Sequence, residues 1–151
     1  MTDAELVRMA LDEHHIPHEL TVLRDGITAL SYASEMKDAS ASICPDIVLL
    51  DMNVPPTTGA TILTELRKCA GCATTPVIVV SCSDRPEDRS RMAALGVNRY
   101  IRKAMDLKGA LELGGIVKDV LQEAKVNGES LRFAVGHFSD PYEQNTQQSP
   151  G

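Results

Sequence analysis

The chain has 151 residues, a hydrophobic content of 43% and a formal net charge of −6 at pH 7. This length predicts one domain with at most a small appendage. The acidic balance argues against non-specific binding to nucleic acid or to anionic membranes. No apolar run reaches the ~20 residues of a membrane-spanning helix, and the opening TDAELVRMALDE lacks the basic and apolar parts of a signal peptide. We therefore expect a cytoplasmic protein that binds neither nucleic acid nor membranes.

The first half of the chain alternates between helical and extended patterns. DAELVRMALDEHH carries apolar residues at helical spacing, HELTVLR alternates like a strand, and ITALSYASEM is helical again. IVLLD is a short apolar run bounded by prolines, which is typical of a strand buried on both faces. GATILTELRKCAG is amphipathic and ends near Gly71. The expected helices are 3–15, 27–36 and 59–71, and the expected strands are 18–24 and 46–51.

The second half continues this alternation. Pro76 opens PVIVVS, a second strand that is apolar on both sides, and a helix with an early proline, a polar strand and a long amphipathic helix follow it. Gly114 and Gly115 each weaken that last helix by about 1 kcal/mol relative to alanine. These elements are expected at 76–81, 83–96, 97–103 and 106–125. Periodicity is lost afterwards, so we expect a folded domain at 1–125 and a flexible C-terminal tail at 126–151.

This order of elements predicts an α/β fold, a doubly wound parallel sheet of the flavodoxin-like type. The chain begins with a helix, however, and only four strands are recognisable. In the flavodoxin-like strand order 2-1-3-4-5, the strand before the first helix is central. The predicted fold therefore lacks its first strand, and the strand around Leu20 has no neighbour.

Three polar residues follow the ends of successive strands: Asp51, Ser81 and Lys103. The carboxyl ends of parallel strands lie side by side, so these side chains can converge on one pocket. Such a set suits phosphoryl chemistry, because the carboxylate can form an acyl phosphate while the ammonium and the hydroxyl stabilise the transferred group. The coincidence of position and order, rather than any single residue, carries this hypothesis.

The segments PDIVLLDMNVP, GATILTELR, TPVIVVSCSD, LGVNRYIRKAMD and LRDGITAL resemble the response-regulator receiver domains of two-component signalling. The resemblance spans about residues 3–124 and is greatest to stand-alone receivers that partner phytochrome-like kinases. It implies that Asp51 accepts a phosphoryl group from a sensor histidine kinase in a phosphorelay. It also implies that Ser81 is the switch hydroxyl, Lys103 a phosphate contact, Tyr100 the switch aromatic residue, and the backbone carbonyl of Asn53 a ligand of Mg²⁺.

Two departures from the family pattern stand out. Ala104 occupies the position of a proline that usually follows the lysine. The acidic pair that ends the family's first strand is absent together with that strand, so Asp51 and Asn53 alone predict weak Mg²⁺ binding. Three explanations stay open: an upstream first strand before Met1, a strand borrowed from a second copy in a homodimer, or a remnant that folds poorly.

Two other functions stay open beside the phosphoacceptor. The lost acids and Ala104 favour a degenerate, non-phosphorylated receiver that acts as a protein-interaction module. LLDMNVP also resembles the opening motif of haloacid-dehalogenase-like phosphatases, which use an aspartyl phosphate, but Asn53 replaces their general acid and cannot supply a carboxyl proton. We therefore do not expect an enzyme.

The chain contains four cysteines, Cys44, Cys69, Cys72 and Cys82. In a cytoplasmic protein they are expected to be thiols. Cys69 and Cys72 form a single CxxC, which lacks the second cysteine pair of a zinc site. We therefore expect these two cysteines to be ordinary small residues at the end of a helix rather than zinc ligands.

Overall fold

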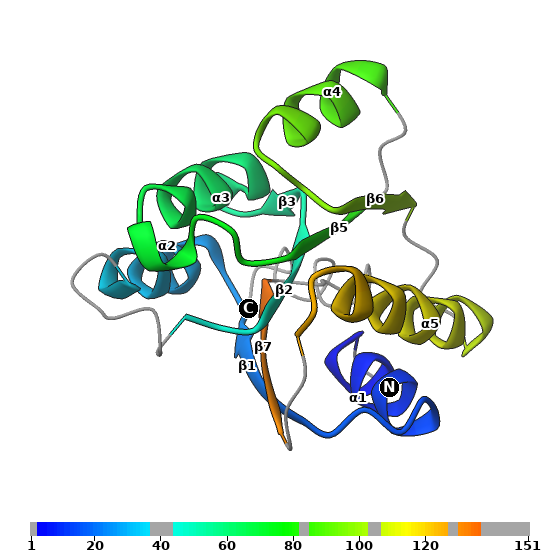
Figure 1. Cartoon of the computed structure of the whole chain (residues 1–151). Coiled ribbons are helices and arrows are strands. Elements are labelled where there is room, and N and C mark those ends of the chain that lie inside the picture. Colours follow the sequence, from blue (N-terminus) through cyan, green and yellow to red (C-terminus); the bar gives the residue numbers. More distant parts are fainter. Residues whose placement is uncertain (1–2, 37–43, 82–84, 103–106, 127–129, 137–151) are drawn as a thin grey trace, which may run out of the picture.

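The computed structural model of the chain describes residues 3–36, 44–81, 85–102, 107–126 and 130–136. It has one parallel sheet of five strands in the order β1-β7-β2-β5-β6. These strands are β1 His18–Leu23, β2 Ile47–Asp51, β5 Val77–Ser81, β6 Arg99–Arg102 and β7 Leu131–Gly136, and a separate short hairpin pairs β3 Asn53–Val54 with β4 Thr57–Thr58. Figure 1 shows the sheet between two layers of helices.

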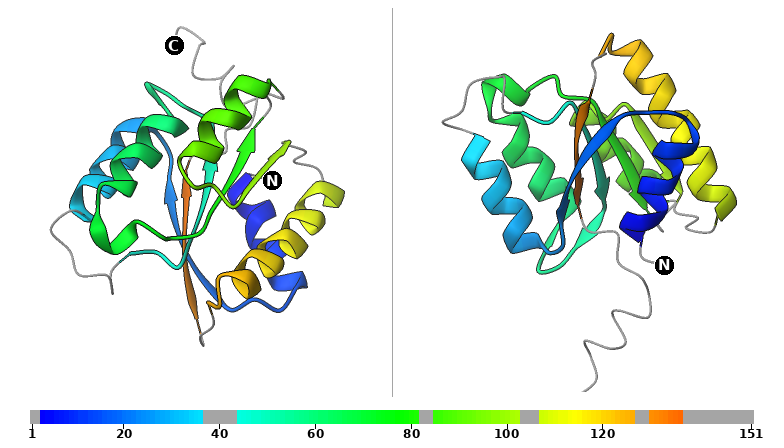
Figure 2. Two further views of the ribbon diagram at one scale, coloured as in Figure 1. Left: turned by 45° about the horizontal axis from the view of Figure 1, so that its top comes forward. Right: turned by 90° about the horizontal axis from the view of Figure 1, so that it is seen from below.

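The helices cover the two faces of the sheet unequally. α1 Asp3–Glu13 packs against α5 Leu107–Glu123 on one face, and α2 Gly26–Glu35 packs against α3 Gly59–Arg67 on the other (Figure 2). α4 Pro86–Ala94 joins the α2 and α3 side through its buried Met92, and the short helix η3 Ala70–Cys72 follows α3. Aliphatic clusters on each side confirm the predicted doubly wound architecture. None of the described helices is long and apolar enough to cross a membrane.

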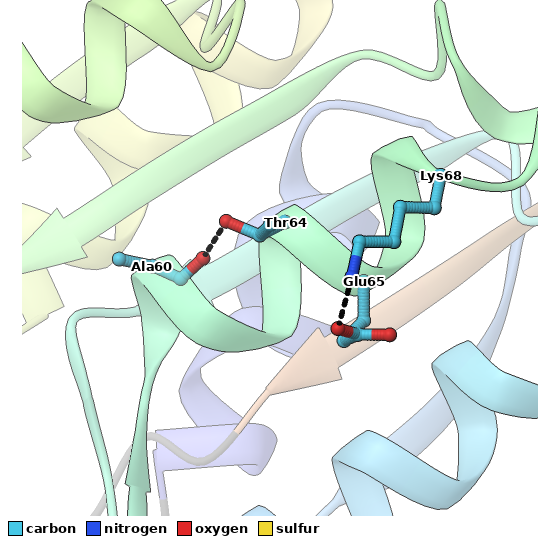
Figure 3. Close-up of polar contacts among 4 residues, drawn as sticks. All are labelled: Ala60, Thr64, Glu65 and Lys68. Atoms are coloured by element: carbon cyan, nitrogen blue, oxygen red, sulfur yellow. Dashed lines mark hydrogen bonds and ion pairs between the residues drawn. The ribbon is translucent and has the colours of Figure 1, made fainter.

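Local sequence accounts for where these helices begin. The Asp25 carboxylate accepts a hydrogen bond of 2.7 Å from the amide of Thr28 and so caps α2. Thr58 caps α3 in the same way through the amide of Thr61. Within α3, Thr64 donates to the carbonyl of Ala60 and Lys68 pairs with Glu65 at 2.9 Å (Figure 3). The exposed ion pair adds little stability, and burial of one apolar face of α3 contributes more.

The centre of the sheet contradicts the predicted domain boundaries. Leu131–Gly136, expected in a flexible tail, forms β7 and lies parallel between β1 and β2. Phe133 faces Leu20 of β1 and Ile47 of β2, and only 1% of Phe133 is exposed. The prediction of a flexible tail starting at residue 126 is therefore wrong for this strand. The sequence of a short segment does not show which distant strands it will pair with.

β7 also corrects the prediction that the chain lacks its first strand. When β7 is counted as strand 1, the observed order becomes 2-1-3-4-5, which is the flavodoxin-like order. The chain thus has the connectivity of a circular permutation, in which the central strand comes last instead of first. Strand borrowing from a second copy is not needed to complete this sheet, since the same chain supplies the strand.

Backbone and side-chain hydrogen bonds hold the start of β7 in register. The amide of Leu131 donates to the carbonyl of Pro17 at 3.1 Å, and the amide of Asp46 donates to the carbonyl of Arg132 at 2.8 Å. The carboxylate of Asp46 in turn accepts from the amide of Arg132 at 2.7 Å. Both neighbouring strands are therefore tied to β7 before the paired register begins.

The cysteines also differ from the prediction of free thiols. Cys44 and Cys72 form a disulfide with a Cα–Cα distance of 5.7 Å, and Cys69 is a buried free thiol. Cys82 lies outside the described residues. The CxxC pair is thus neither a zinc pair nor a bridge by itself, because one member bonds to a cysteine from an earlier connection.

Candidate functional site

Asp51 is the last residue of β2, at the carboxyl edge of the sheet. Asp51 is only 6% exposed, and its Oδ1 accepts a hydrogen bond of 3.0 Å from the amide of Asn53. The preceding residue, Leu50, lies beside Val79 of β5 and Gly136 of β7. Two parallel neighbours therefore place Asp51 at the centre of the edge where open α/β sheets bind ligands.

Close packing of α3 fixes the backbone at Asp51. The amide of Gly59 donates to the carbonyl of Met52 at 2.8 Å. A Cβ atom on Gly59 would collide with the carbonyl oxygen of Asp51 and lie 3.1 Å from the Cα of Met52. Glycine at the first position of α3 therefore lets the helix start directly against the candidate nucleophile.

Ser81 ends the neighbouring strand at the same edge. It is 2% exposed and pairs with Arg102 of β6, while the residue before it, Val80, pairs with Asp51. The structure thus brings the predicted carboxylate and hydroxyl to adjacent strands at the same edge of the sheet, with Ser81 one residue further along β5 than the partner of Asp51. Lys103, which follows Arg102 in the sequence, lies outside the described residues, as does Ala104.

Tyr100 lies in the middle of β6 and is half-buried. The guanidinium of Arg89 lies 4.8 Å from the centre of the Tyr100 ring, and its Nη1 donates to the Tyr100 carbonyl at 3.4 Å. A cation–π contact at such an exposed position contributes roughly 0.5–1 kcal/mol. Sequence reasoning missed Arg89, because its contact depends on how α4 packs over β6.

The described residues do not complete the expected metal site. Within these residues, no group of three or more histidine, cysteine, aspartate or glutamate side chains close enough to bind a metal includes Asp51. Asn53 begins β3, two residues after Asp51, and the role of its backbone carbonyl as a metal ligand stays a prediction. After Gly136 the sequence continues with His137 and Phe138, which are not acidic and lie outside the described residues. Among the described residues, the Asp51 carboxylate by itself falls short of the octahedral oxygen set that Mg²⁺ requires.

The sheet order and the position of Asp51 at its central edge define a flavodoxin-like α/β domain with a buried carboxylate at the ligand-binding edge. A family model of the response regulator receiver domain matches residues 3–112 of this chain. Response regulator Rcp1 of Synechocystis sp. is 32% identical over 111 residues, which make up 74% of this chain and 76% of Rcp1. The chain therefore belongs to the response regulator receiver domain family. The match to the family model ends before β7, so the permuted strand lies outside the matched residues.

Solved structures agree with this assignment. The phosphorylated cyanobacterial phytochrome response regulator RcpA has a TM-score of 0.66 and 28% identity, covering 81% of this chain and 87% of RcpA. The Mn²⁺-bound form of Rcp1 has a TM-score of 0.64 and 30% identity, covering 78% and 84%. Members of this family are two-component signalling proteins rather than typical enzymes, and phosphorylation on aspartate is characteristic of them.

Proposed function

We propose that this chain is a single-domain response regulator whose Asp51 accepts a phosphoryl group from a sensor histidine kinase in a phosphorelay. One observation carries the proposal. Asp51 is a buried carboxylate at the carboxyl end of a central strand, and Ser81, which is also buried, ends the adjacent strand. Aspartates that only form turns are rarely buried in this way, so the burial of Asp51 favours a functional role.

The proposed reaction forms an acyl phosphate. A carboxylate oxygen of Asp51 attacks the phosphorus of the phosphohistidine, the P–N bond breaks, and the imidazole leaves and takes up a proton. The hydroxyl of Ser81 donates a hydrogen bond to a phosphoryl oxygen, and the ammonium of Lys103 offsets its charge. These roles for Ser81 and Lys103 follow the family resemblance.

In this proposal, phosphorylation changes the surface formed by α4, β6 and α5, and this surface transmits the signal. Arg89 and Tyr100 already couple α4 to β6 through the ring contact and the carbonyl hydrogen bond. We propose that a new negative charge at Asp51 shifts Ser81 and biases Tyr100 between two positions. The proposed partner is a sensor histidine kinase, while the net charge of −6 disfavours nucleic acid and anionic membranes. A cytoplasmic location belongs to the same proposal, whereas the homodimer expected from strand borrowing loses that support because β7 of the same chain completes the sheet.

Treatment with acetyl phosphate and Mg²⁺ tests this proposal directly. We expect intact-mass spectrometry to show addition of one phosphoryl group, and we expect Asp51→Asn to abolish it because the amide cannot form an acyl phosphate. Asp119→Asn is the matched control, since Asp119 is an exposed acid on α5 and its loss leaves the site unchanged. Unmodified wild-type protein, or equal modification of Asp51→Asn, would exclude the phosphoacceptor role.

Metal dependence forms a second prediction. Rcp1 binds Mn²⁺ in a solved structure, and we propose that this chain also takes a divalent cation, but weakly, because the described residues supply only one carboxylate. Isothermal titration calorimetry with Mg²⁺ should show no tight site, and Asp51→Asn should remove the weak one. A tight site that survives Asp51→Asn would place the metal elsewhere.

The lack of a second acid beside Asp51 among the described residues also favours the second candidate, an interaction module that is never phosphorylated. In that case binding to the partner kinase would be unchanged by Asp51→Ala and by beryllofluoride, a phosphoryl mimic. Under the phosphoacceptor proposal, beryllofluoride alters partner binding in the wild type and has no effect on Asp51→Ala. A pull-down with the partner kinase therefore separates the two.

A further inference from the structure

Three cysteines gather at the amino-terminal edge of the sheet, opposite Asp51. Cys44 precedes β2, Cys69 follows α3, and Cys72 ends η3 before β5. All three are at most 5% exposed, and their sulfur atoms lie within 4.8 Å of one another. We call Cys44, Cys69 and Cys72 the cysteine cluster.

The existing bridge joins two different connections of the fold. Cys44 and Cys72 are 28 positions apart, so their disulfide ties the segment that enters β2 to the connection between α3 and β5. A bridge between Cys69 and Cys72 would instead close a single turn. The Cys44–Cys72 bridge therefore ties Cys44 to the connection between α3 and β5, whereas a Cys69–Cys72 bridge would leave Cys44 unbonded.

The turn that carries Cys69 and Cys72 is held independently of the bridge. The amide of Cys72 donates to the carbonyl of Cys69 at 3.0 Å. Nη1 of Arg67 donates to the carbonyls of Cys72 at 3.0 Å and Thr75 at 2.8 Å. The thiol of Cys69 donates to the carbonyl of Met36, at the end of α2. Two sulfur atoms thus share one anchored turn, and both lie within reach of the third.

We propose that the cysteine cluster is a thiol–disulfide exchange site, in which Cys69 competes with Cys44 for Cys72. The Cys69 thiolate attacks the Cys72 sulfur, the Cys69–Cys72 bond forms, the Cys44–Cys72 bond breaks, and the released Cys44 thiolate takes up the proton that Cys69 lost. No oxidant or reductant is consumed, since one disulfide and one thiol are present before and after. The step frees the segment that enters β2.

A purely structural bridge does not account for the third sulfur. A stabilising disulfide acts by closing a long loop, and it needs only Cys44 and Cys72. A thiol held next to that bridge supplies the attacking group that exchange requires. Disulfides in cytoplasmic proteins are mostly transient or redox-active, which agrees with exchange if the chain has the location proposed above. The inference does not depend on phosphorylation of Asp51.

Disulfide mapping in the Cys82→Ser protein tests the proposal, because only the cysteine cluster then remains. The folded protein is shifted from acidic to alkaline pH, free thiols are trapped with N-ethylmaleimide, and the digested peptides are assigned by mass spectrometry. We expect a Cys69–Cys72 species to grow with time after the shift, because the thiolate is the attacking form. Protein held at acidic pH should keep the Cys44–Cys72 species.

Two further variants define the exchange. With Cys82→Ser as background, Cys69→Ser should hold only the Cys44–Cys72 bridge, and Cys44→Ser treated with oxidised glutathione should form the Cys69–Cys72 bridge. Circular dichroism reports whether Cys44→Ser is folded, and the pH shift decides the question if it is not. The proposal is overturned if Cys69–Cys72 peptides never appear in the folded Cys82→Ser protein, or appear only in urea, where the unfolded chain scrambles.

Discussion

A chain that ends at Val126 should fail to fold cooperatively, because it lacks β7. Removing this strand leaves the facing backbone edges of β1 and β2 without their partners, and unpaired buried backbone groups are costly. It also removes the buried side chains of Leu131, Phe133 and Val135. Each such loss costs roughly 2–5 kcal/mol, against a net stability of about 5–15 kcal/mol for a whole domain. Urea unfolding followed by circular dichroism should show no cooperative transition.

Point substitutions in β7 give the same test within a full-length chain. Phe133→Ala should lower the free energy of unfolding by about 3–5 kcal/mol, because the ring is 1% exposed between two strands. Arg132→Ala is the matched control on the same strand, since its side chain is 43% exposed and its ion pair with Asp46 spans 3.9 Å. Its cost should stay within about 1 kcal/mol.

Two outcomes would contradict this role of β7. One is a chain ending at Val126 that unfolds with the same midpoint as the full chain. The other is an equal, small effect of Phe133→Ala and Arg132→Ala. Either result would mean that the centre of the sheet is filled by something other than Leu131–Gly136.

Gly114→Ala should destabilise the protein although alanine is the better helix former. Gly114 is buried where α5 crosses α1, and a Cβ atom there would collide with the ring of His14 and lie 2.8 Å from the carbonyl oxygen of Ala10. The Ala10 backbone cannot yield without moving α1. His14 also keeps its Nε2 2.9 Å from the Leu111 carbonyl. We expect a net loss of about 1–2 kcal/mol after the gain in helix propensity.

Gly115→Ala provides the matched control one position further along α5. A Cβ atom on Gly115 would meet only Cε1 of His14 at 3.7 Å, an ordinary van der Waals contact. This variant should therefore gain up to about 1 kcal/mol from helix propensity. Urea midpoints of the two variants should shift in opposite directions, and a shift in the same direction would disprove the close approach at Gly114. The predicted weakening of the helix by both glycines thus has a structural reason at one of them.

The sequence was sufficient to predict which residues of the candidate site end buried strands. IVLLD and PVIVVS are apolar up to their last residue, and the structure buries every residue of β2 and β5. The polar residue that ends each run, Asp51 or Ser81, therefore had to lie at the carboxyl edge of a buried parallel sheet. The contact between Arg89 and Tyr100 was not predictable, because the two residues meet only when α4 packs over β6.

By itself, the sequence determined the five long helices and the four long strands before residue 126 and the edge that holds Asp51, since periodicity, caps and breakers act over a few residues. It did not predict the β3–β4 hairpin or η3, which takes up the end of the helix expected at 59–71. Tertiary structure alone decided the place of Leu131–Gly136 and the partner of Cys72. A six-residue segment such as LRFAVG could lie in a tail, at the edge of a sheet or at its centre, and only the space between β1 and β2 selects the centre. A cysteine likewise pairs with whichever sulfur the fold brings near, here one that is 28 positions away. Both outcomes depend on long-range contacts, which local patterns do not encode.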